Sequence, residues 1–151
     1  MSRQATCKER LPFEYRRELA RIKTALGWNN RGAKWFDSNS TEDRYSEYIE
    51  GVLTFDRDTT MLRGVPKPRW LITDEDGASI EPDYAQAIGV ELSTGGPADG
   101  FVLFARKNDN GFWVIERAYY YFQDWFDGAH CEVTGRNLEA IRDMFGEWIS
   151  N

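Results

Sequence analysis

FVLFARKNDNGFWVIERAYYYF, residues 101–122, is the least polar stretch of a rather polar chain. Two apolar and aromatic runs, 101–107 and 112–122, flank the polar segment 108–111, which ends in Asn-Gly. An Asn-Gly pair between two strand-like runs is a strong short-range signal for a β-hairpin. The sequence therefore predicts an antiparallel hairpin at the centre of the fold.

Side chains alternate between two faces along each strand of such a hairpin. One face then carries Phe101, Leu103, Ala105, Phe112, Val114, Glu116, Ala118, Tyr120 and Phe122. The opposite face carries Val102, Phe104, Arg106, Trp113, Ile115, Arg117, Tyr119 and Tyr121. The alternation does not decide which of the two faces is buried.

Glu116 is the only carboxylate on the first face. If that face packs under helices, Glu116 becomes a candidate general base in a sheet-lined cavity, with Tyr120 beside it. The alternative is that Glu116 lies near an edge of the sheet or pairs with an arginine.

The second face mixes aromatic residues with arginines: Trp113, Tyr119 and Tyr121 with Arg106 and Arg117. These residue types are enriched as anchors in protein interfaces. Nucleic-acid bases also stack on such aromatics, so a nucleic-acid-binding sheet is an alternative. The third interpretation is that this face is the other half of the core.

Apolar residues recur at helical spacing near both ends of the chain, as Leu11, Tyr15, Leu19, Ile22 and Leu26 and as Leu138, Ile141, Phe145 and Trp148. They predict helices over 12–26 and 134–149, with residues 1–10 frayed. In the first helix, Glu14 precedes Arg17 and Glu18 precedes Arg21 at helical-neighbour spacing. This spacing indicates a solvated face of ion pairs.

Alternating patterns between the helices predict strands over 44–55, 61–63, 69–73 and 89–92. A short strand at 33–36 is expected within the loop 28–41, and Pro82 suits the start of a short helix over 82–87. The predicted fold is α+β, an antiparallel sheet of about five or six strands with the N-terminal and C-terminal helices packed on one face. A chain of 151 residues is expected to form a single domain, 1–151.

Charge is unevenly distributed along the chain. Residues 1–34 hold nine Lys/Arg against three Glu, a balance of +6, whereas residues 35–151 hold ten Lys/Arg against 22 Asp/Glu, a balance of −12. An acidic body is repelled by phosphate backbones, so nucleic acid is a disfavoured partner. Acidic partners could still meet the basic N-terminal segment.

No motif for catalysis, a metal or a cofactor emerges. His130 adjoins Cys131, but sequence neighbours rarely have the geometry of a base and its nucleophile. Cys7 and Cys131 fit neither a disulfide framework nor a zinc site. Calcium-loop patterns that begin at Asp74 or Asp37 lack the glutamate at the last ligand position. We therefore expect no cofactor and no metal.

The start of the chain lacks the apolar stretch of a signal peptide, and no apolar run is long enough to cross a bilayer. These features predict a cytoplasmic protein without membrane contact. The sequence leaves the oligomeric state open.

The sequence favours a protein-binding or inhibitory function over an enzymatic one. Clustered carboxylates could occupy a basic groove on a partner protein, including a groove that binds nucleic acid. The expected partner-binding residues are Asp37, Glu42, Asp43, Glu47, Asp56, Asp58, Asp74, Glu75, Asp76, Arg106, Trp113, Arg117, Tyr119 and Tyr121. In composition the chain is similar to immunity proteins and phage-encoded anti-defence proteins, which implies inhibition by surface complementarity. The alternatives are a small enzyme or ligand binder around Glu116, and a nucleic-acid-binding module.

Overall fold

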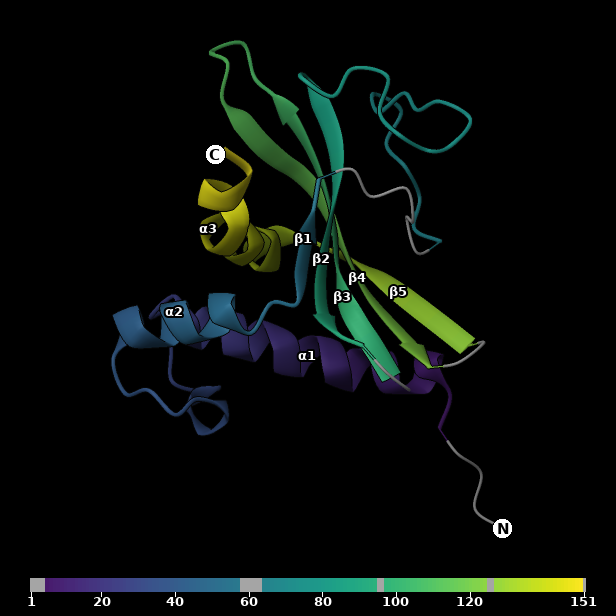
Figure 1. The fold of residues 1–151 in the computed structure, drawn as a ribbon. Helices are drawn as coiled ribbons and strands as arrows, with labels where there is room; N and C mark the ends of the chain where they lie inside the picture. The colour runs from purple at the N-terminus through teal and green to yellow at the C-terminus, as the bar shows by residue number, and fades with distance from the viewer. Residues whose placement is uncertain (1–4, 58–63, 95–96, 125–126, 151) are drawn as a thin grey trace.

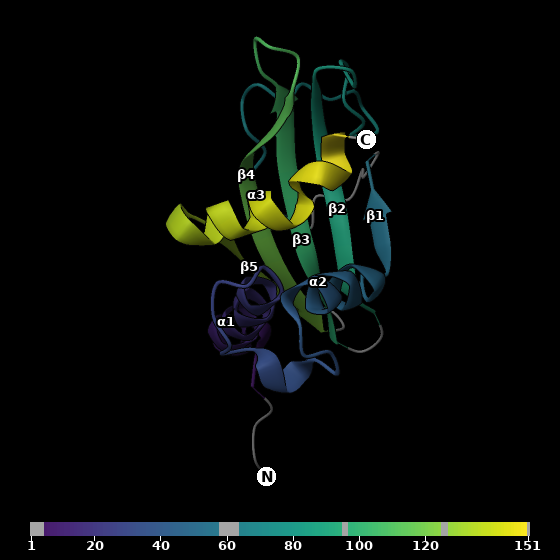
Figure 2. The same ribbon diagram turned by 90° about the vertical axis from the view of Figure 1, so that its left-hand side faces the viewer.

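The computed structural model describes residues 5–57, 64–94, 97–124 and 127–150. The elements in chain order are α1 (Cys7–Ala25), the 3₁₀ helix η1 (Ala33–Trp35), α2 (Thr41–Glu50), β1 (Thr54–Asp56), β2 (Ala85–Ser93), β3 (Pro97–Lys107), β4 (Trp113–Asp124), β5 (Asp127–Val133) and α3 (Gly135–Ser150). The five strands pair antiparallel in the order β1-β2-β3-β4-β5. Figures 1 and 2 show α1, α2 and α3 on one face of this sheet, which confirms the predicted α+β fold.

The predicted hairpin is the β3–β4 pair at the centre of the sheet. Its register shifts between Phe104, which pairs with Arg117, and Ala105, which pairs with Ile115. Glu116 is therefore the extra residue of a β-bulge, and it points to the same face as Arg117. Between the hairpin turn and this bulge, the side chains of β4 point to the sheet faces opposite to those predicted, because the inserted residue shifts the alternation by one position. Ile115 packs in the core under the helices instead of on the opposite face.

Helix α1 begins earlier than expected. Residues 1–10 were expected to be frayed, but the helix starts at Cys7, and residues 1–4 lie outside the described part. Thr6 caps it by accepting a hydrogen bond from the Glu9 amide at 3.2 Å. The Cys7 amide also donates to Asp127 Oδ2 at 2.7 Å, which ties this end of α1 to the start of β5.

Helix α2 replaces most of the strand predicted over 44–55. Ser40 caps it by accepting a hydrogen bond from the Asp43 amide at 3.2 Å. Of the predicted strand, only residues 54 and 55 lie in β1, which ends one residue later at Asp56. The pattern was misread because Tyr45, Tyr48 and Ile49 also lie at helical spacing and face the core. Tyr45 Oη donates to the Met144 carbonyl at 3.0 Å and so links α2 to α3.

Several shorter predictions were wrong. Residues 33–35 form η1 instead of a strand, 69–73 are turn and coil with one isolated bridge from Thr73 to Ser79, and 82–84 form a turn. The strand predicted over 89–92 is the longer β2, and the predicted strand 61–63 lies outside the described residues. Strand β5 was not predicted, since its sequence DGAHCEV has few strand-forming residues.

The sheet packs against side chains on both faces. Under the helices, the Phe101 ring lies 5.4 Å from that of Tyr120 and 6.0 Å from that of Phe145. On the opposite face, Val65 and Leu71 from the segment 64–84 join a second buried cluster with Val102, Phe104, Tyr119 and Tyr121. The structure is therefore a sheet with a helical layer on one side and an irregular layer over part of the other.

We predict that Gly100→Ala lowers the free energy of unfolding by about 1–3 kcal/mol, as expected for overpacking in a closed site. Gly100 is buried in β3, and an added Cβ would overlap the Val90 carbonyl oxygen and lie 2.6 Å from Tyr121 Oη. Urea denaturation followed by circular dichroism measures the change. The matched variant Gly146→Ala in α3 meets no atom within 4 Å, so it should raise stability by about 0.5–1 kcal/mol. Equal effects of the two variants would contradict the packing at Gly100.

Candidate functional site

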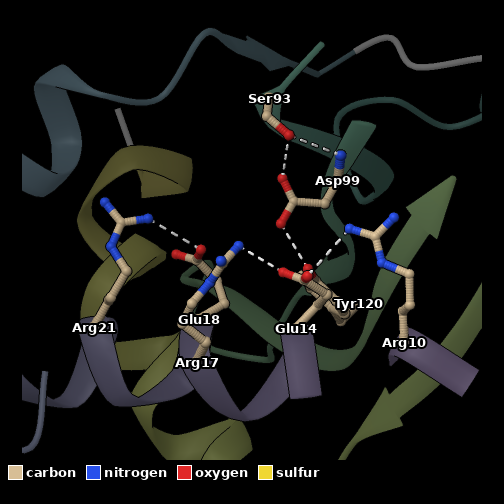
Figure 3. Close-up of polar contacts among 8 residues, drawn as sticks. All are labelled: Arg10, Glu14, Arg17, Glu18, Arg21, Ser93, Asp99 and Tyr120. Carbon is tan, nitrogen blue, oxygen red and sulfur yellow. Dashed lines mark hydrogen bonds and ion pairs between the residues drawn. The ribbon is translucent and has the colours of Figure 1, made fainter. Parts of the chain in front are cut away.

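Three carboxylates are buried where α1 meets the sheet (Figure 3). Glu14 and Glu18 lie one helical turn apart on α1, and Asp99 comes from the start of β3. Their exposed fractions are 6%, 2% and 6%, so they are among the few polar residues inside the protein. The sequence predicted the ion pairs of Glu14 and Glu18 but placed them on a solvated face. That placement was wrong, because the helical stripe that α1 buries is wide enough to include both glutamates.

Tyrosines from two other elements hold two of the carboxylates. Tyr48 Oη of α2 donates to Glu18 Oε2 at 2.6 Å, and Tyr120 Oη of β4 donates to Asp99 Oδ2 at 2.6 Å. The other Asp99 oxygen accepts from the Ser93 hydroxyl at 2.5 Å. Burial, followed by the adjacent carboxylate, raises the pKa of Tyr48 and of Tyr120. Both phenols therefore stay protonated at neutral pH and can donate these hydrogen bonds.

Arginines from α1 compensate the glutamates. Arg21 lies 3.1 Å from Glu18 Oε1, and Arg10 lies 3.5 Å from Glu14 Oε1. Arg17 lies 2.5 Å from Glu14 Oε2, yet that oxygen has no contact in a hydrogen-bonding direction. The two groups attract each other as an ion pair, because the Coulomb energy depends on the distance between the charges and not on a bond angle. All six carboxylate oxygens thus have a polar or charged partner, which leaves none directed at a substrate.

Glu18 is enclosed at the contact between α1 and α2. Burial raises its pKa above the ordinary value of 4.5, while the Arg21 charge and the Tyr48 hydrogen bond act in the opposite direction. A raised pKa is one signature of a general acid or base, but such a group needs access to substrate. Glu18 is enclosed by its own partners, so the cluster connects α1, α2, β3 and β4 and offers no open catalytic group.

The residues proposed for an enzymatic alternative do not come together. Glu116 lies on the bulge with its side chain 31% exposed, and it pairs with Arg106 at 2.7 Å. Tyr120 is fully buried on the helical side of the sheet. Glu116 and Tyr120 therefore face opposite sides. Of the two arrangements considered for Glu116, the structure shows the ion pair with an arginine.

The Arg/aromatic face of the hairpin is largely internal. Tyr119 and Tyr121 are buried in the second cluster, and Trp113 packs on the helical side because of the bulge. Arg117 pairs with Glu132 at 2.6 Å, and Arg106 lies over the Trp70 ring at 5.4 Å. The tyrosines on this face are thus core residues rather than exposed anchors.

His130 and Cys131 project from opposite sides of β5. The His130 ring lies 5.8 Å from that of Tyr119 on the outer face, whereas Cys131 packs against the helical core. Burial raises the pKa of the Cys131 thiol to about 11. This geometry does not form a nucleophile–base pair.

The acidic residues around α2 have structural roles. Glu47 accepts hydrogen bonds from the Asp37 and Ser38 amides and from the Ser38 hydroxyl, at 2.9–3.2 Å. Glu42 and Asp43 lie in the first turn of α2, where carboxylates stabilise a helix. Asp56 ends β1, and Asp58 lies outside the described residues.

The segment 72–84, here called the acidic loop, has a different character. Its sequence ITDEDGASIEPDY holds five carboxylates and no Lys, Arg or His. Asp74 shapes the tip by accepting hydrogen bonds from the Asp76 and Ala78 amides at 2.9 and 3.0 Å. The Ile80 amide donates to the Ile72 carbonyl at 2.9 Å, which closes the tip into a small hairpin.

The acidic loop also exposes large apolar side chains. Ile72, Ile80 and Tyr84 are 60%, 57% and 64% exposed. Phe112, which is 67% exposed, lies in the β3–β4 turn at the same end of the sheet (Figure 1). The Tyr84 carbonyl accepts a hydrogen bond from the Lys107 amide at 2.9 Å, which joins the loop to this end of β3.

Sequence reasoning identified Asp74, Glu75 and Asp76 but missed the apolar half of this surface. It assigned Ile72 to a strand, and it assigned 82–87 to a helix. A signal was present in the sequence, because 72–84 lies inside the cation-free run 70–105 and combines five carboxylates with three bulky apolar residues. Their exposure depends on tertiary packing and could not be read from the pattern.

In the described ranges, no group of three or more His, Cys, Asp or Glu side chains could hold a metal ion. None of the helices in this part of the chain is long and apolar enough to cross a membrane. Comparison with protein-family models, curated proteins and solved structures found no match.

We predict that Glu18→Gln changes the pH dependence of stability. The folded state retains the Glu18 proton above pH 4.5, where the unfolded chain has lost it, so unfolding releases a proton there. We compare the free energies of unfolding of the unmodified protein and the variant. As the pH rises from 4.5 towards the folded-state pKa, the unmodified protein should lose stability relative to the variant, by up to about 1.4 kcal/mol per pH unit. Urea titrations across this range measure the difference.

Glu47→Gln is the matched variant with the opposite expected sign. Desolvation acts to raise the pKa of Glu47, but the hydrogen bonds from Ser38 and Asp37 outweigh it and lower the pKa below 4.5. The contribution of Glu47 to stability should therefore be lost as pH falls through the folded-state pKa. Differences of the same sign for both variants would contradict the two environments.

We predict strong coupling between Asp99 and Tyr120. Tyr120→Phe leaves one Asp99 oxygen without its donor, at a cost of about 1–3 kcal/mol. The cycle of Tyr120→Phe, Asp99→Asn and the double variant should give an interaction energy above about 1 kcal/mol. The exposed pair Arg106–Glu116 is the control, with an expected coupling of about 0–1 kcal/mol. Equal coupling in both cycles would argue against a buried, specific Asp99–Tyr120 contact.

Proposed function

We propose that this protein binds the basic surface of a partner protein through the acidic loop, and that it acts by surface complementarity without catalysis. One observation carries the proposal. A stretch of 13 residues, 72–84, combines five carboxylates with three large exposed apolar side chains and contains no cation.

The free carboxylates supply the electrostatic part of the proposal. Among the described residues, Glu75, Asp76, Glu81 and Asp83 have no ion pair and no side-chain hydrogen bond. Their charge is therefore available to a partner. Carboxylates gathered on one loop would steer a basic protein towards it and would disfavour acidic proteins and nucleic acid.

The apolar side chains supply the contact that charges alone do not. Aromatic and branched residues at the centre of an interface contribute most of its affinity, whereas rim charges mainly affect association rate. Ile80 and Tyr84 lie among the carboxylates of the loop, as an apolar centre with a charged rim requires.

The base of the loop supports a preformed binding surface. Leu71 is 2% exposed under the sheet, Ala85 is buried at the start of β2, and the Ser79 hydroxyl donates to the Ala85 carbonyl at 2.7 Å. Lys67 Nζ donates to Thr73 Oγ1 at 2.8 Å. A loop held at both ends loses less conformational entropy on binding than a free segment does.

A basic groove that normally holds nucleic acid is the partner surface that fits best, because the loop offers closely spaced negative charges. This occupancy would inhibit the partner in the manner of immunity and anti-defence proteins, to which the composition is similar. The bulge position of Glu116 and the closed carboxylate cluster offer no comparable support for an enzyme.

We predict that the triple variant Glu75→Gln, Asp76→Asn, Asp83→Asn loses its partner. The protein and the variant are immobilised and exposed to lysate of the cell that encodes the chain, and retained proteins are compared by mass spectrometry over a salt series. The unmodified protein should retain basic proteins that elute with salt or with added duplex DNA. The triple variant should bind them at least about tenfold more weakly, since interfacial ion pairs contribute about 1 kcal/mol or more each.

The triple variant Glu139→Gln, Asp143→Asn, Glu147→Gln on α3 is the matched control, with the same change in net charge on the other side of the sheet. It should retain the same proteins as the unmodified chain. Ile72→Ser with Ile80→Ser should also weaken retention while leaving the dependence on salt. Retention that is unaffected by the loop variants, or lost equally in the α3 control, would overturn the proposal.

A further inference from the structure

A second charged surface lies on the helical side of the protein. A groove of about 340 Å³ runs along α1 and is lined by Tyr15, Arg16, Leu19, Ala20, Lys23, Asn29, Arg31 and Asn137. Residues of α1 form its floor, the loop after α1 forms one wall, and the start of α3 forms the other. Its size is near the lower end of the range for small-molecule sites.

The wall after α1 is held tightly in place. The Gly32 amide donates to the buried Thr24 hydroxyl at 2.8 Å. A Cβ at Gly32 would lie 2.7 Å from the Ala20 carbonyl oxygen, so only glycine lets the chain approach α1 this closely. The Asn29 side chain accepts a hydrogen bond from the Arg31 amide at 3.0 Å, which fixes the turn that carries both residues.

The cations of the groove lack compensating carboxylates. Of the arginines on α1, Arg10, Arg17 and Arg21 pair with the buried glutamates. In the part of the chain that the structure describes, Arg16, Lys23 and Arg31 have no ion pair with a carboxylate. Three positive charges thus gather in one groove of an otherwise acidic protein.

The pKa of Lys23 reflects its burial and the excess of positive charge in the groove. Burial lowers the pKa of its amine, and repulsion from Arg136 and Arg31 lowers it further. No carboxylate is among the causes of the shift. Arg136 is the chain neighbour of the groove residue Asn137; it lies over the Trp28 ring at 4.5 Å and 3.7 Å from Glu139. An anion placed beside Lys23 would relieve the repulsion between these cations.

We propose that this groove binds a small phosphorylated ligand, with Arg16, Lys23 and Arg31 as the phosphate-binding residues. Guanidinium groups bind phosphate through paired, charge-assisted hydrogen bonds, and a lysine adds a point charge. Asn29, Asn137 and Tyr15 add neutral polar groups, of which the Asn137 amide already donates to Tyr15 Oη at 3.2 Å. Leu19 and Ala20 give the floor an apolar part that suits the uncharged portion of such a ligand.

This site is independent of the acidic loop, which lies on the other face of the sheet. The probes are inorganic pyrophosphate and adenosine monophosphate, titrated at constant low ionic strength and followed by calorimetry and by amide chemical shifts. We expect saturable binding of at least one probe, with shifts confined to residues 15–23, 29–31 and 136–138. Asn137→Asp, which places a negative charge in the groove, should abolish it.

Lys23→Met and Arg31→Gln should each weaken binding at least about tenfold, because each removes a charge-assisted contact. Lys34→Met and Arg69→Gln are matched controls outside the groove and should leave the affinity unchanged. Circular dichroism checks that every variant is folded. Absence of saturation up to about 10 mM, equal weakening in the controls, or binding of duplex DNA without binding of either probe would overturn the proposal.

Discussion

The pairing of β3 with β4 is the contact on which the other layers depend. It is the longest ladder in the sheet, and both strands contribute buried side chains to both faces. The bulge at Glu116 is part of this constraint. It directs Ile115 into the helical core, while the Ile115 carbonyl accepts a hydrogen bond from Arg142 of α3 at 2.7 Å. The position of α3 on the sheet is therefore coupled to one inserted residue.

Local patterns were sufficient for the elements whose stabilising contacts are local. The Asn-Gly turn identifies the central hairpin, and the apolar stripes identify α1 and α3, because turn chemistry and helical periodicity are written into neighbouring residues. Helix α2 was misassigned because ten residues with Tyr45 and Ile49 satisfy the strand and helix patterns equally. Strand β5 is stabilised by its pairing with β4, which no local pattern reveals.

At the candidate sites, too, local sequence patterns did not reveal features that depend on tertiary packing. The carboxylates at 74–76 could be found from sequence, since a charge cluster is visible in the letters alone. The exposure of Ile72 and Ile80 could not be found in this way, because the sequence does not show that the fold buries Leu71 and leaves these two isoleucines exposed. The bulge is equally invisible, and it is the reason that Glu116 lies in solvent contact rather than in a cavity. Register, which decides faces, is a property of two strands together.

The buried carboxylate cluster and the two surfaces fit one electrostatic arrangement. Glu14 and Glu18 pair with Arg10, Arg17 and Arg21 of α1, whereas Arg16, Lys23 and Arg31 line the groove. The acidic loop and the groove lie on opposite faces of the sheet, and packed layers in proteins are spaced by about 10 Å. Because the Debye length at physiological ionic strength is about 8 Å, the two surfaces are largely screened from each other. The net charge of −6 therefore describes neither surface, and each is expected to select its partner by its own local potential.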